Sequence, residues 1–308
     1  MRILILGAGA TGGYFGGRLM EAGENVTFLV RPKRQQQLRE TGLVVLSPKG
    51  DIRLPAQTVT RIAKPYDLVL LSAKAYDLDS AVEAIRPAVG EGTLVLPLLN
   101  GLAHLERLDA ALGAGRVLGG LCNISVTLEP DGTIRHLPSG HKLIFGARYA
   151  AQEAGAAAAM ASLGKSAAEV IHSPDILQDM WEKWVMLATL AGGTCLMRGG
   201  ISDILTAGGE GFLLGLLEEC RSVAAAEGRP PREAAMAACA KLFTDRAEPM
   251  VASMLRDIRR GGATEGEHVL GDLVRRAKSH GVPVPRLESA LLHVRTYEAL
   301  RAKEEIKP

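Results

Sequence analysis

A short glycine pattern near the N-terminus constrains the fold more than any other feature of this sequence. Gly7, Gly9 and Gly12 form a Gly-x-Gly-x-x-Gly pattern that directly follows an apolar run at residues 2–6 and opens a segment with helical spacing. The next β-rich run, residues 25–30, completes a strand–helix–strand unit of about 30 residues. The pattern alone is a weak signal, because glycine-rich turns are common, but in such a unit it is typical of a phosphate-binding loop.

Each glycine has its own physical role in a loop of this kind. Gly7 permits the tight turn, Gly9 lets a pyrophosphate approach the backbone, and Gly12 allows the helix to pack closely on the strand. Ala10 and Thr11 begin the helix, whose N-terminal N–H groups and positive partial charge favour phosphate. We therefore predict that these five residues bind a dinucleotide, with a plain tight turn as the alternative.

The residues after the second strand indicate which dinucleotide is bound. A protein that binds NAD usually has Asp or Glu there, about 20 residues beyond the glycines. This chain has LVRPKRQ instead, with Arg31, Lys33 and Arg34 and no acid. A carboxylate would repel a 2′-phosphate, whereas a guanidinium pairs with it bidentately. NADP(H) is therefore the predicted cofactor and Arg31 its predicted contact, while Lys33 and Arg34 are either further contacts or part of an exposed turn.

The chain is long enough for two domains, at 308 residues, and its pattern changes once. Before residue 174, runs typical of strands alternate with helical patterns, and from Pro174 onward only helical segments separated by Gly and Pro are predicted. The predicted fold is α/β: a Rossmann-type sheet domain over 1–173, followed by an all-α domain over 174–308. Strands beyond the first two are expected at 43–55 (a hairpin), 67–73, 93–99, 117–129, 132–137, 141–147 and 168–173.

Composition excludes several classes of partner. The chain is 47% hydrophobic and 23% charged, as expected of a protein that forms a core. A net charge of +2 without a long basic run argues against nucleic acid as the main partner. No apolar stretch reaches the length that spans a bilayer, and the apolar run at 2–6 is too short for a signal peptide.

Cysteine and histidine spacing bears on location and metal binding. The four cysteines are far apart and form no CxxC pair, which is typical of reduced thiols in a cytoplasmic protein. The seven histidines do not cluster at metal-ligand spacing, so no metal is expected. The apolar helical half is compatible with a homodimer.

Four further motifs place the chain in a family. They are SAKAYD (72–77), LLNG (98–101), MWEKW (180–184) and SMLRDIRRGGATE (253–265). Together with the glycine loop they make the chain resemble the ketopantoate reductase family over essentially its whole length. The resemblance implies a Rossmann domain joined to a helical domain that binds substrate and carries the catalytic residues. It also implies NADPH-dependent reduction of a 2-keto acid to a 2-hydroxy acid, with ketopantoate (2-dehydropantoate) as the expected substrate.

The resemblance also implies roles for individual residues. Carried over by position, Lys183 is the catalytic lysine, Glu265 a second catalytic residue on the substrate side, and Ser253 a substrate-binding serine. Asn100 is implied to contact both cofactor and substrate, and Lys74 the nicotinamide end of the cofactor. From the residues alone, Asn100 and Lys74 follow the ends of parallel strands, where open α/β sheets bind ligands. The alternatives are a simple turn for Asn100 and an acid at a helix N-terminus for Glu265.

Lys183 lies in a helical segment, residues 180–193, that is apolar almost all the way round. A lysine that extends its ammonium to water is the structural alternative to a catalytic role. Reduction of a ketone leaves negative charge on its oxygen. A cation placed there stabilises that charge and can donate the proton. We therefore expect Lys183 to be the catalytic acid and to bind the substrate.

The chain departs from the family pattern on the same helical segment. Typical members have asparagines one and two turns after the catalytic lysine, where this chain has Leu187 and Ala191. An apolar wall favours an apolar substrate, so we expect a 2-keto or 3-keto acid with a less hydroxylated tail. Arg198, beyond this segment, either meets a substrate carboxylate or caps a helix C-terminus.

Two other functions remain open from the sequence. A non-catalytic NADP-binding sensor or interaction protein would keep the glycine loop without needing Lys183 or Glu265. A reductase of the hydroxyacid-dehydrogenase type also combines a Rossmann domain, a helical domain and a lysine, but its glycine-rich substrate loop is not found here.

Overall fold

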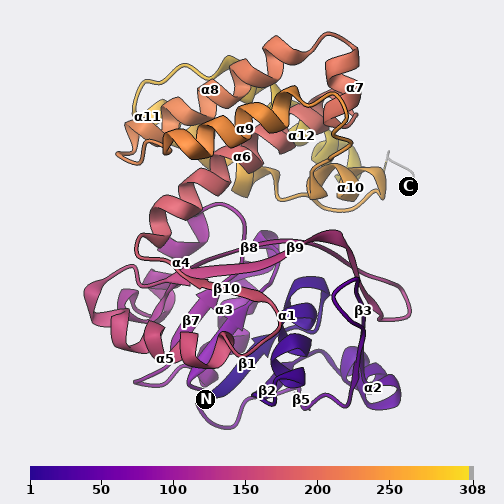
Figure 1. Ribbon diagram of the computed structural model, residues 1–308, viewed down its shortest axis with the longest axis vertical. Coiled ribbons are helices and arrows are strands. Elements are labelled where there is room, and N and C mark those ends of the chain that lie inside the picture. The colour runs from indigo at the N-terminus through magenta and orange to yellow at the C-terminus, as the bar shows by residue number, and fades with distance from the viewer. Residues whose placement is uncertain (305–308) are drawn as a thin grey trace. The chain divides into compact units, whose positions relative to one another are not determined.

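A computed structural model describes residues 1–304, and for Ser139 it describes the backbone alone. The chain forms two compact units. Unit 1 comprises residues 1–99 and 104–177, and unit 2 comprises residues 100–103 and the chain from residue 178 onward. The predicted α/β architecture, a Rossmann-type sheet region followed by a helical region, is confirmed (Figure 1). The assignment of cofactor binding to 1–173 and of substrate binding to 174–308 stays a prediction.

Sheet A of unit 1 is fully parallel and carries the glycine loop. Its strand order is β5-β2-β1-β6-β7. Residues 3–5 of β1 and all of β6 are buried, as the continuous apolar runs predict for strands covered on both faces. The strands are β1 (Arg2–Leu6), β2 (Asn25–Leu29), β5 (Thr58–Val59), β6 (Leu68–Leu71) and β7 (Leu94–Pro97).

Sheet B of unit 1 is mixed and is built around one long strand. The order is β10-β9-β3-β4, and β8 pairs with β9 in an antiparallel ribbon. The sequence predicts two strands at 132–137 and 141–147, which are instead one strand, β9 (Ile134–Gly146). Pro138 and Gly140 within it do not end the strand. The other strands are β3 (Leu43–Leu46), β4 (Ile52–Leu54), β8 (Gly119–Leu128) and β10 (Glu169–His172).

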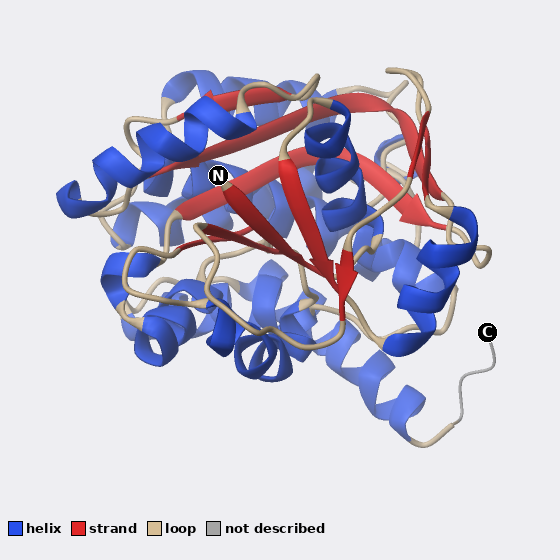
Figure 2. Ribbon diagram, turned by 90° about the horizontal axis from the view of Figure 1, so that it is seen from below, coloured by secondary structure: helices blue, strands red, loops and turns tan. Residues whose placement is uncertain are grey.

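Helix α1 (Ala10–Glu21) packs against both sheets through its glycines. A Cβ added at Gly16 would lie 2.5 Å from the Phe28 ring of sheet A, and one at Gly17 would lie 3.1 Å from Leu43 of sheet B. Glycine costs a helix interior up to about 1 kcal/mol relative to alanine. Here it lets the helix that begins at the glycine loop pack closely on two sheets at once (Figure 2).

The remaining helices of unit 1 cover or connect the sheets. Helix α2 begins with Pro32, which suits the first turn, and ends at Gly42, whose φ is +71°. The helices are α2 (Pro32–Thr41), α3 (Leu78–Ile85), α4 (Ala103–Leu112) and α5 (Glu153–Leu163). The 3₁₀ turns are η1 (Ala75–Asp77), η2 (Arg86–Ala88), η3 (Ala114–Arg116) and η4 (Ala150–Gln152).

Unit 2 contains only helices from residue 178 to 304 (Figure 1). Its longest helix, α6, is buried along much of its length, which explains why its sequence is apolar nearly all round. Helix α6 begins within unit 1, at Ile176. The helices are α6 (Ile176–Met197), α7 (Ile201–Thr206), α8 (Glu210–Ala226), α9 (Glu233–Thr244), α10 (Ser253–Arg259), the π-helix η5 (Glu267–Gly271), α11 (Asp272–Ser279) and α12 (Pro285–Ala302).

Candidate active site

The glycine loop joins β1 to α1. Gly7 has φ +82°, a conformation that favours glycine, and its N–H donates to the carbonyl of Leu29 in β2 at 2.8 Å. Gly12 has no room for a side chain, because a Cβ there would meet the Ser72 side chain and lie 2.9 Å from the Gly7 carbonyl oxygen. Backbone conformation and helix–strand packing therefore account for the first and third glycines.

The middle glycine leaves the N-terminus of α1 open. Gly9 caps the helix without a side-chain hydrogen bond, and the first turn contains no acid. A Cβ added at Gly9 would have no neighbour within 4 Å. Because the N–H groups of a first helical turn lack intrahelical acceptors, this end presents donors and positive partial charge to open space. The arrangement fits a phosphate group.

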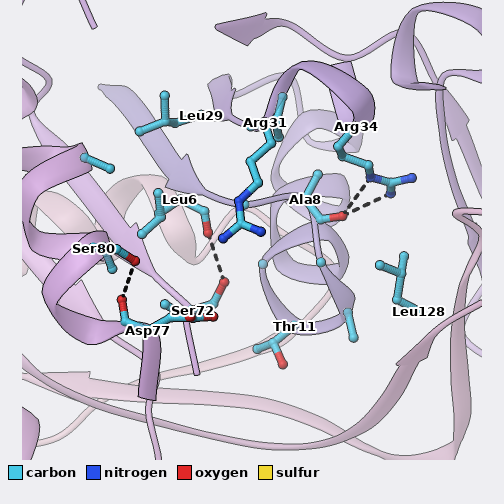
Figure 3. Close-up of a pocket in the computed structure, with 18 of the residues that line it drawn as sticks. Leu6, Ala8, Thr11, Leu29, Arg31, Arg34, Ser72, Asp77, Ser80 and Leu128 are labelled. Carbon is cyan, nitrogen blue, oxygen red and sulfur yellow. Dashed lines mark hydrogen bonds between the residues drawn. The ribbon is translucent and has the colours of Figure 1, made fainter. Parts of the chain in front are cut away.

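A pocket of about 780 Å³ opens over this loop within unit 1. Its volume lies within the range typical of small-molecule sites. Figure 3 shows side chains from the loop, from the end of β2 and from the β6–α3 segment around it. The lining includes every predicted loop residue and Arg31: Gly7, Gly9, Ala10, Thr11, Gly12 and Arg31.

Arg31 follows β2 directly and caps α2 in an extended conformation. Its side chain is exposed and extends into the pocket beside the glycine loop (Figure 3). The residues that line the pocket at this end of β2 are Leu29, Val30, Arg31, Pro32 and Arg34, and none is acidic. This position suits a cationic contact to a ligand phosphate.

Arg34 has a different environment from its neighbours in the basic run. Its guanidinium donates twice to the Ala8 carbonyl, from Nε at 3.2 Å and from Nη2 at 3.0 Å, and once to the Gly132 carbonyl at 3.0 Å. Burial lowers its pKa from the usual value, and nearby Asp131 opposes that shift. The run 31–34 is the start of helix α2, not the exposed turn that the sequence left as an alternative, and Lys33 on this helix is exposed.

Lys74 lies between β6 and the 3₁₀ turn η1, half-buried, and its carbonyl accepts the N–H of Asp77 at 2.9 Å. The pocket is lined by its neighbours Ser72, Ala73 and Asp77, and Lys74 is outside that lining. The structure therefore brings the glycine loop and Arg31 together in one pocket but does not add Lys74 to it.

In unit 2, the structure brings together two of the predicted site residues. Lys183 Nζ donates a hydrogen bond to Asn100 Oδ1 at 3.1 Å, and both side chains are half-buried. Asn100 belongs to the short segment 100–103 that packs with unit 2. Gly101 beside it has φ +74°, and a Cβ there would lie 3.3 Å from Cδ2 of His268. The turn that presents Asn100 is therefore packed closely against the π-helix.

The helix around Lys183 is fixed on both sides of the lysine. Trp184 is buried and its indole N–H donates to the carbonyl of Val269 in the π-helix at 2.8 Å. The carboxylates of Glu182 and Asp179 both pair with Arg232. Burial raises the pKa of Glu182, but hydrogen bonds from Arg232 and Gln178 outweigh it and leave the pKa below its usual value.

Two further predicted residues lie elsewhere in unit 2. Glu265 is half-buried just before the π-helix, and its carbonyl accepts the N–H groups of His268 at 3.1 Å and Val269 at 2.9 Å. Ser253 is the first residue of α10 and is exposed. Glu265 thus precedes the same π-helix that packs against Gly101 and Trp184, whereas Ser253 lies on the separate helix α10.

The positions of Leu187, Ala191 and Arg198 follow from the geometry of α6. Leu187 is half-buried and Ala191 is buried. Arg198 follows the helix with φ +60°, and its carbonyl accepts a hydrogen bond from Arg259. The fourteen helical residues between Lys183 and Arg198 set their backbones about 22 Å apart along the helix, and a role for Arg198 at a substrate carboxylate stays a prediction.

Sequence reasoning missed the structural roles of two residues, Arg34 beside the glycine loop and His268 beside Gly101. The sequence offers Arg34 only as a possible phosphate contact. Its bonds join it to the glycine loop at Ala8, 26 positions away, and to the turn between β8 and β9 at Gly132, 98 positions away. His268 carried no signal, because its contact with Gly101 depends on the packing of the π-helix. The sequence offers one indication of this role: Arg34 is a basic residue at the third position of the helix that follows the strand–helix–strand unit.

Among residues 1–304, no helix combines the length and apolarity needed to cross a membrane. Over the same residues, no three His, Cys, Asp or Glu side chains are grouped so as to hold a metal ion.

A parallel sheet with a glycine loop and pocket, followed by a helical unit that carries a lysine–asparagine pair, is typical of oxidoreductases of the Rossmann type. Residues 3–148 match the family described as "Ketopantoate reductase PanE/ApbA", and residues 175–298 match its C-terminal counterpart. The chain belongs to the ketopantoate reductase family.

Individual relatives agree with this assignment over nearly full length. The chain is 36% identical to the uncharacterized oxidoreductase YkpB of Bacillus subtilis, covering 97% of this chain and 99% of YkpB. It is 28% identical to 2-dehydropantoate 2-reductase of Halobacterium salinarum, and the match covers 92% of this chain and 95% of that protein. A crystal structure of a PanE/ApbA family ketopantoate reductase from Ralstonia eutropha matches with a TM-score of 0.88 and 26% identity, covering 98% of this chain and all of that one (100%).

Proposed function

We propose that the protein is an NADPH-dependent reductase that converts a 2-keto acid to a 2-hydroxy acid. Family membership supports an oxidoreductase of the ketopantoate reductase type. The observation that carries the catalytic assignment is the hydrogen bond from Lys183 Nζ to Asn100 Oδ1. Two motif residues far apart in the sequence thereby place an ammonium group beside an amide.

The residues around the glycine loop fit a nicotinamide dinucleotide. The open space at Gly9 and the first-turn N–H groups of α1 suit the pyrophosphate. Arg31 extends into the same pocket with a guanidinium that can pair bidentately with a 2′-phosphate, which favours NADP over NAD. Bound there, the cofactor supplies the hydride for the reduction. Lys74 and Asn100 are proposed as further cofactor contacts from the family resemblance.

Lys183 is proposed to be the acid of the reaction. As the carbonyl carbon is reduced, negative charge develops on the carbonyl oxygen, and the ammonium stabilises that charge and donates its proton to form the hydroxyl. Asn100 holds the ammonium through a neutral amide oxygen, which orients the group without cancelling its charge. Lys183 afterwards regains a proton from solvent.

Glu265 and Ser253 are proposed to bind the substrate. Glu265 offers a carboxylate that accepts a hydrogen bond from a substrate hydroxyl, and Ser253 offers a hydroxyl donor at the first position of α10. We also propose that Glu265 assists catalysis, in keeping with the family position that it occupies.

The substrate is proposed to be ketopantoate or an oxo acid with a less polar tail. Leu187 and Ala191 follow Lys183 by one and two helical turns and present only apolar groups. An apolar pocket discriminates only weakly against a substrate with an added hydroxyl group, so ketopantoate stays a candidate. Such a pocket also gives no preference for a substrate that carries this hydroxyl group.

The test is NADPH consumption with a panel of 2-keto and 3-keto acids, repeated with NADH and with Lys183→Ala. Turnover with NADPH that Lys183→Ala abolishes would support the proposal. Tight NADPH binding without turnover of any oxo acid would support a sensor instead. Preference for NADH would overturn the role of Arg31, and turnover of ketopantoate alone would overturn the less polar substrate. A cytoplasmic location and a homodimer stay predictions, to be tested by cell fractionation and light scattering.

A further inference from the structure

The most extensively bonded arginine at the pocket is Arg34. Four of its five N–H donors are used: two by the Ala8 carbonyl, one by the Gly132 carbonyl and one by Gln37 Oε1 at 2.6 Å. Its side chain is half-buried, and Figure 3 shows the paired bonds to Ala8 at the edge of the pocket. An arginine with so many protein acceptors has little capacity left for a ligand phosphate.

The first of these acceptors lies within the glycine loop. Ala8 stands between Gly7 and Gly9, so its carbonyl orientation is tied to the peptide planes on either side. A bond from two guanidinium nitrogens to one carbonyl fixes that orientation more strictly than a single bond does. Arg34 therefore restrains the segment that presents open space and N–H groups at the start of α1.

The second acceptor belongs to the turn between β8 and β9. Gly132 has φ +85°, a conformation that favours glycine, and a Cβ there would meet Arg34 Nη1 and Gln37 Nε2 and displace them. Gln37 also donates to the Asp131 carbonyl at 2.5 Å. Leu128 at the end of β8 lines the pocket, so the hairpin that Arg34 holds is itself part of the pocket wall.

We propose that Arg34 is a positioning residue for the dinucleotide, acting through Ala8 and Gly132 and not by contact with the 2′-phosphate. This inference rests on the proposed function, since it concerns the affinity for the same cofactor. It assigns different tasks to two arginines three positions apart: Arg31 distinguishes NADP from NAD, and Arg34 supports binding of both.

The experiment measures dissociation constants for NADPH and NADH by titration calorimetry on the full-length protein. Arg34→Gln is expected to weaken both nucleotides about tenfold while leaving their ratio unchanged, because the loop and not the phosphate contact is altered. Arg31→Gln is expected to weaken NADPH about tenfold or more and to leave NADH unchanged. Arg39→Gln, the same substitution at an exposed site on α2, is the control and should change neither.

Two further variants separate positioning from general loss of structure. Arg34→Lys keeps the charge but not the paired bond, and should recover part of the affinity for both nucleotides. Gly132→Ala should reproduce the loss by displacing the guanidinium, and its effect should not add to that of Arg34→Gln. At saturating NADPH, kcat should stay within about twofold of wild type for Arg34→Gln and Arg34→Lys, because the effect is on binding.

The outcomes distinguish this inference from the proposed function. If Arg34→Gln weakens the affinity for NADPH but not for NADH, Arg34 is a phosphate ligand and the positioning role is overturned. Unchanged affinity for both nucleotides would also overturn the positioning role. If Arg34→Gln fails to fold, additive losses or unchanged affinities in Arg34→Lys and Gly132→Ala overturn it equally. Failure of the wild-type protein to bind either nucleotide would instead overturn the proposed function itself.

Discussion

The ammonium of Lys183 and the side-chain amide of Asn100 are joined by a 3.1 Å hydrogen bond across 83 positions of sequence. The lysine comes from the second turn of the long helix α6, and the asparagine from the turn that follows strand β7. An amide oxygen orients an ammonium group without neutralising it, unlike a carboxylate. A cation held in this way is suited to stabilise charge that appears only during a reaction.

Replacement of Lys183 by alanine should therefore affect the chemical step more than binding. We expect kcat/KM for the best oxo acid to fall by roughly 10²–10⁴, the usual effect of removing a catalytic acid and charge stabiliser. The dissociation constant for NADPH should change little. Steady-state kinetics and nucleotide titration check this, with Lys241→Ala, at an exposed site on α9, as control. A fall in kcat/KM of only a few fold would show that Lys183 extends its ammonium group to water and has no catalytic role.

Substitutions of Asn100 test whether the amide positions the lysine. Asn100→Ala removes the acceptor and should lower kcat about 10–100-fold while the protein stays folded. Asn100→Asp keeps the shape but adds a negative charge that stabilises the charged ammonium. It should therefore move the alkaline limb of the pH–rate profile to higher pH. An unchanged pH profile in Asn100→Asp would mean that the observed bond has no part in the reaction.

The parts of this site that the sequence predicts are those whose contacts join residues close together in the chain. The glycine loop, Arg31 and the strand–helix–strand unit are local, so spacing and residue type predict the elements and their order. Lys183 and Asn100 were each predicted from motifs, but their bond depends on how the 100–103 segment packs with unit 2. Local patterns carry no information about that packing.

The missed elements of the fold have similar causes. Helix α2 has a single buried residue, Leu38, so it lacks the apolar period that reveals a helix. Strand β5 has only two residues, too few for a strand pattern. The second sheet joins β3 to β9 in parallel across about 90 positions, a pairing that alternation within either strand does not specify.

The two glycines Gly9 and Gly12 should separate ligand binding from stability. Gly9→Ala meets nothing in the protein, so stability should stay within about 0.5 kcal/mol, but the methyl group occupies space at the start of α1 and NADPH binding should weaken about tenfold or more. Gly12→Ala places a methyl group against Ser72 and the Gly7 carbonyl and should cost about 1–3 kcal/mol of stability. Thermal unfolding and NADPH titration of both variants check this. Normal NADPH affinity in Gly9→Ala would place the cofactor elsewhere.

Leu187→Asn should alter substrate preference. The variant restores a hydrogen-bonding group at the position where typical family members have asparagine, one turn beyond Lys183. We expect the ratio of kcat/KM for ketopantoate to that for its analogue without the hydroxyl group to rise about tenfold or more. Leu292→Asn, at a position that is 65% exposed on α12, is the control and should leave the ratio unchanged. A ratio unaffected by Leu187→Asn would remove this residue from the substrate pocket.

The buried thiols of unit 2 should make the protein less stable in alkali. Burial raises the pKa of Cys195 and of Cys220 from 9.0 to about 12. Between these values the unfolded chain releases a proton from each thiol and the folded chain does not. The folded state therefore binds more protons, and the free energy of unfolding falls as pH rises above 9.

The size of this effect can be isolated by mutation. At pH 10 each thiol should account for roughly 1 kcal/mol of the loss relative to neutral pH. Cys220→Ala lowers stability at pH 7 by removing packed atoms, but its free energy of unfolding should then fall less steeply between pH 8 and pH 10 than that of the wild type, by about that amount. Urea unfolding at a series of pH values measures both slopes. Parallel slopes would show that the Cys220 thiol ionises as readily in the folded protein as in the unfolded chain.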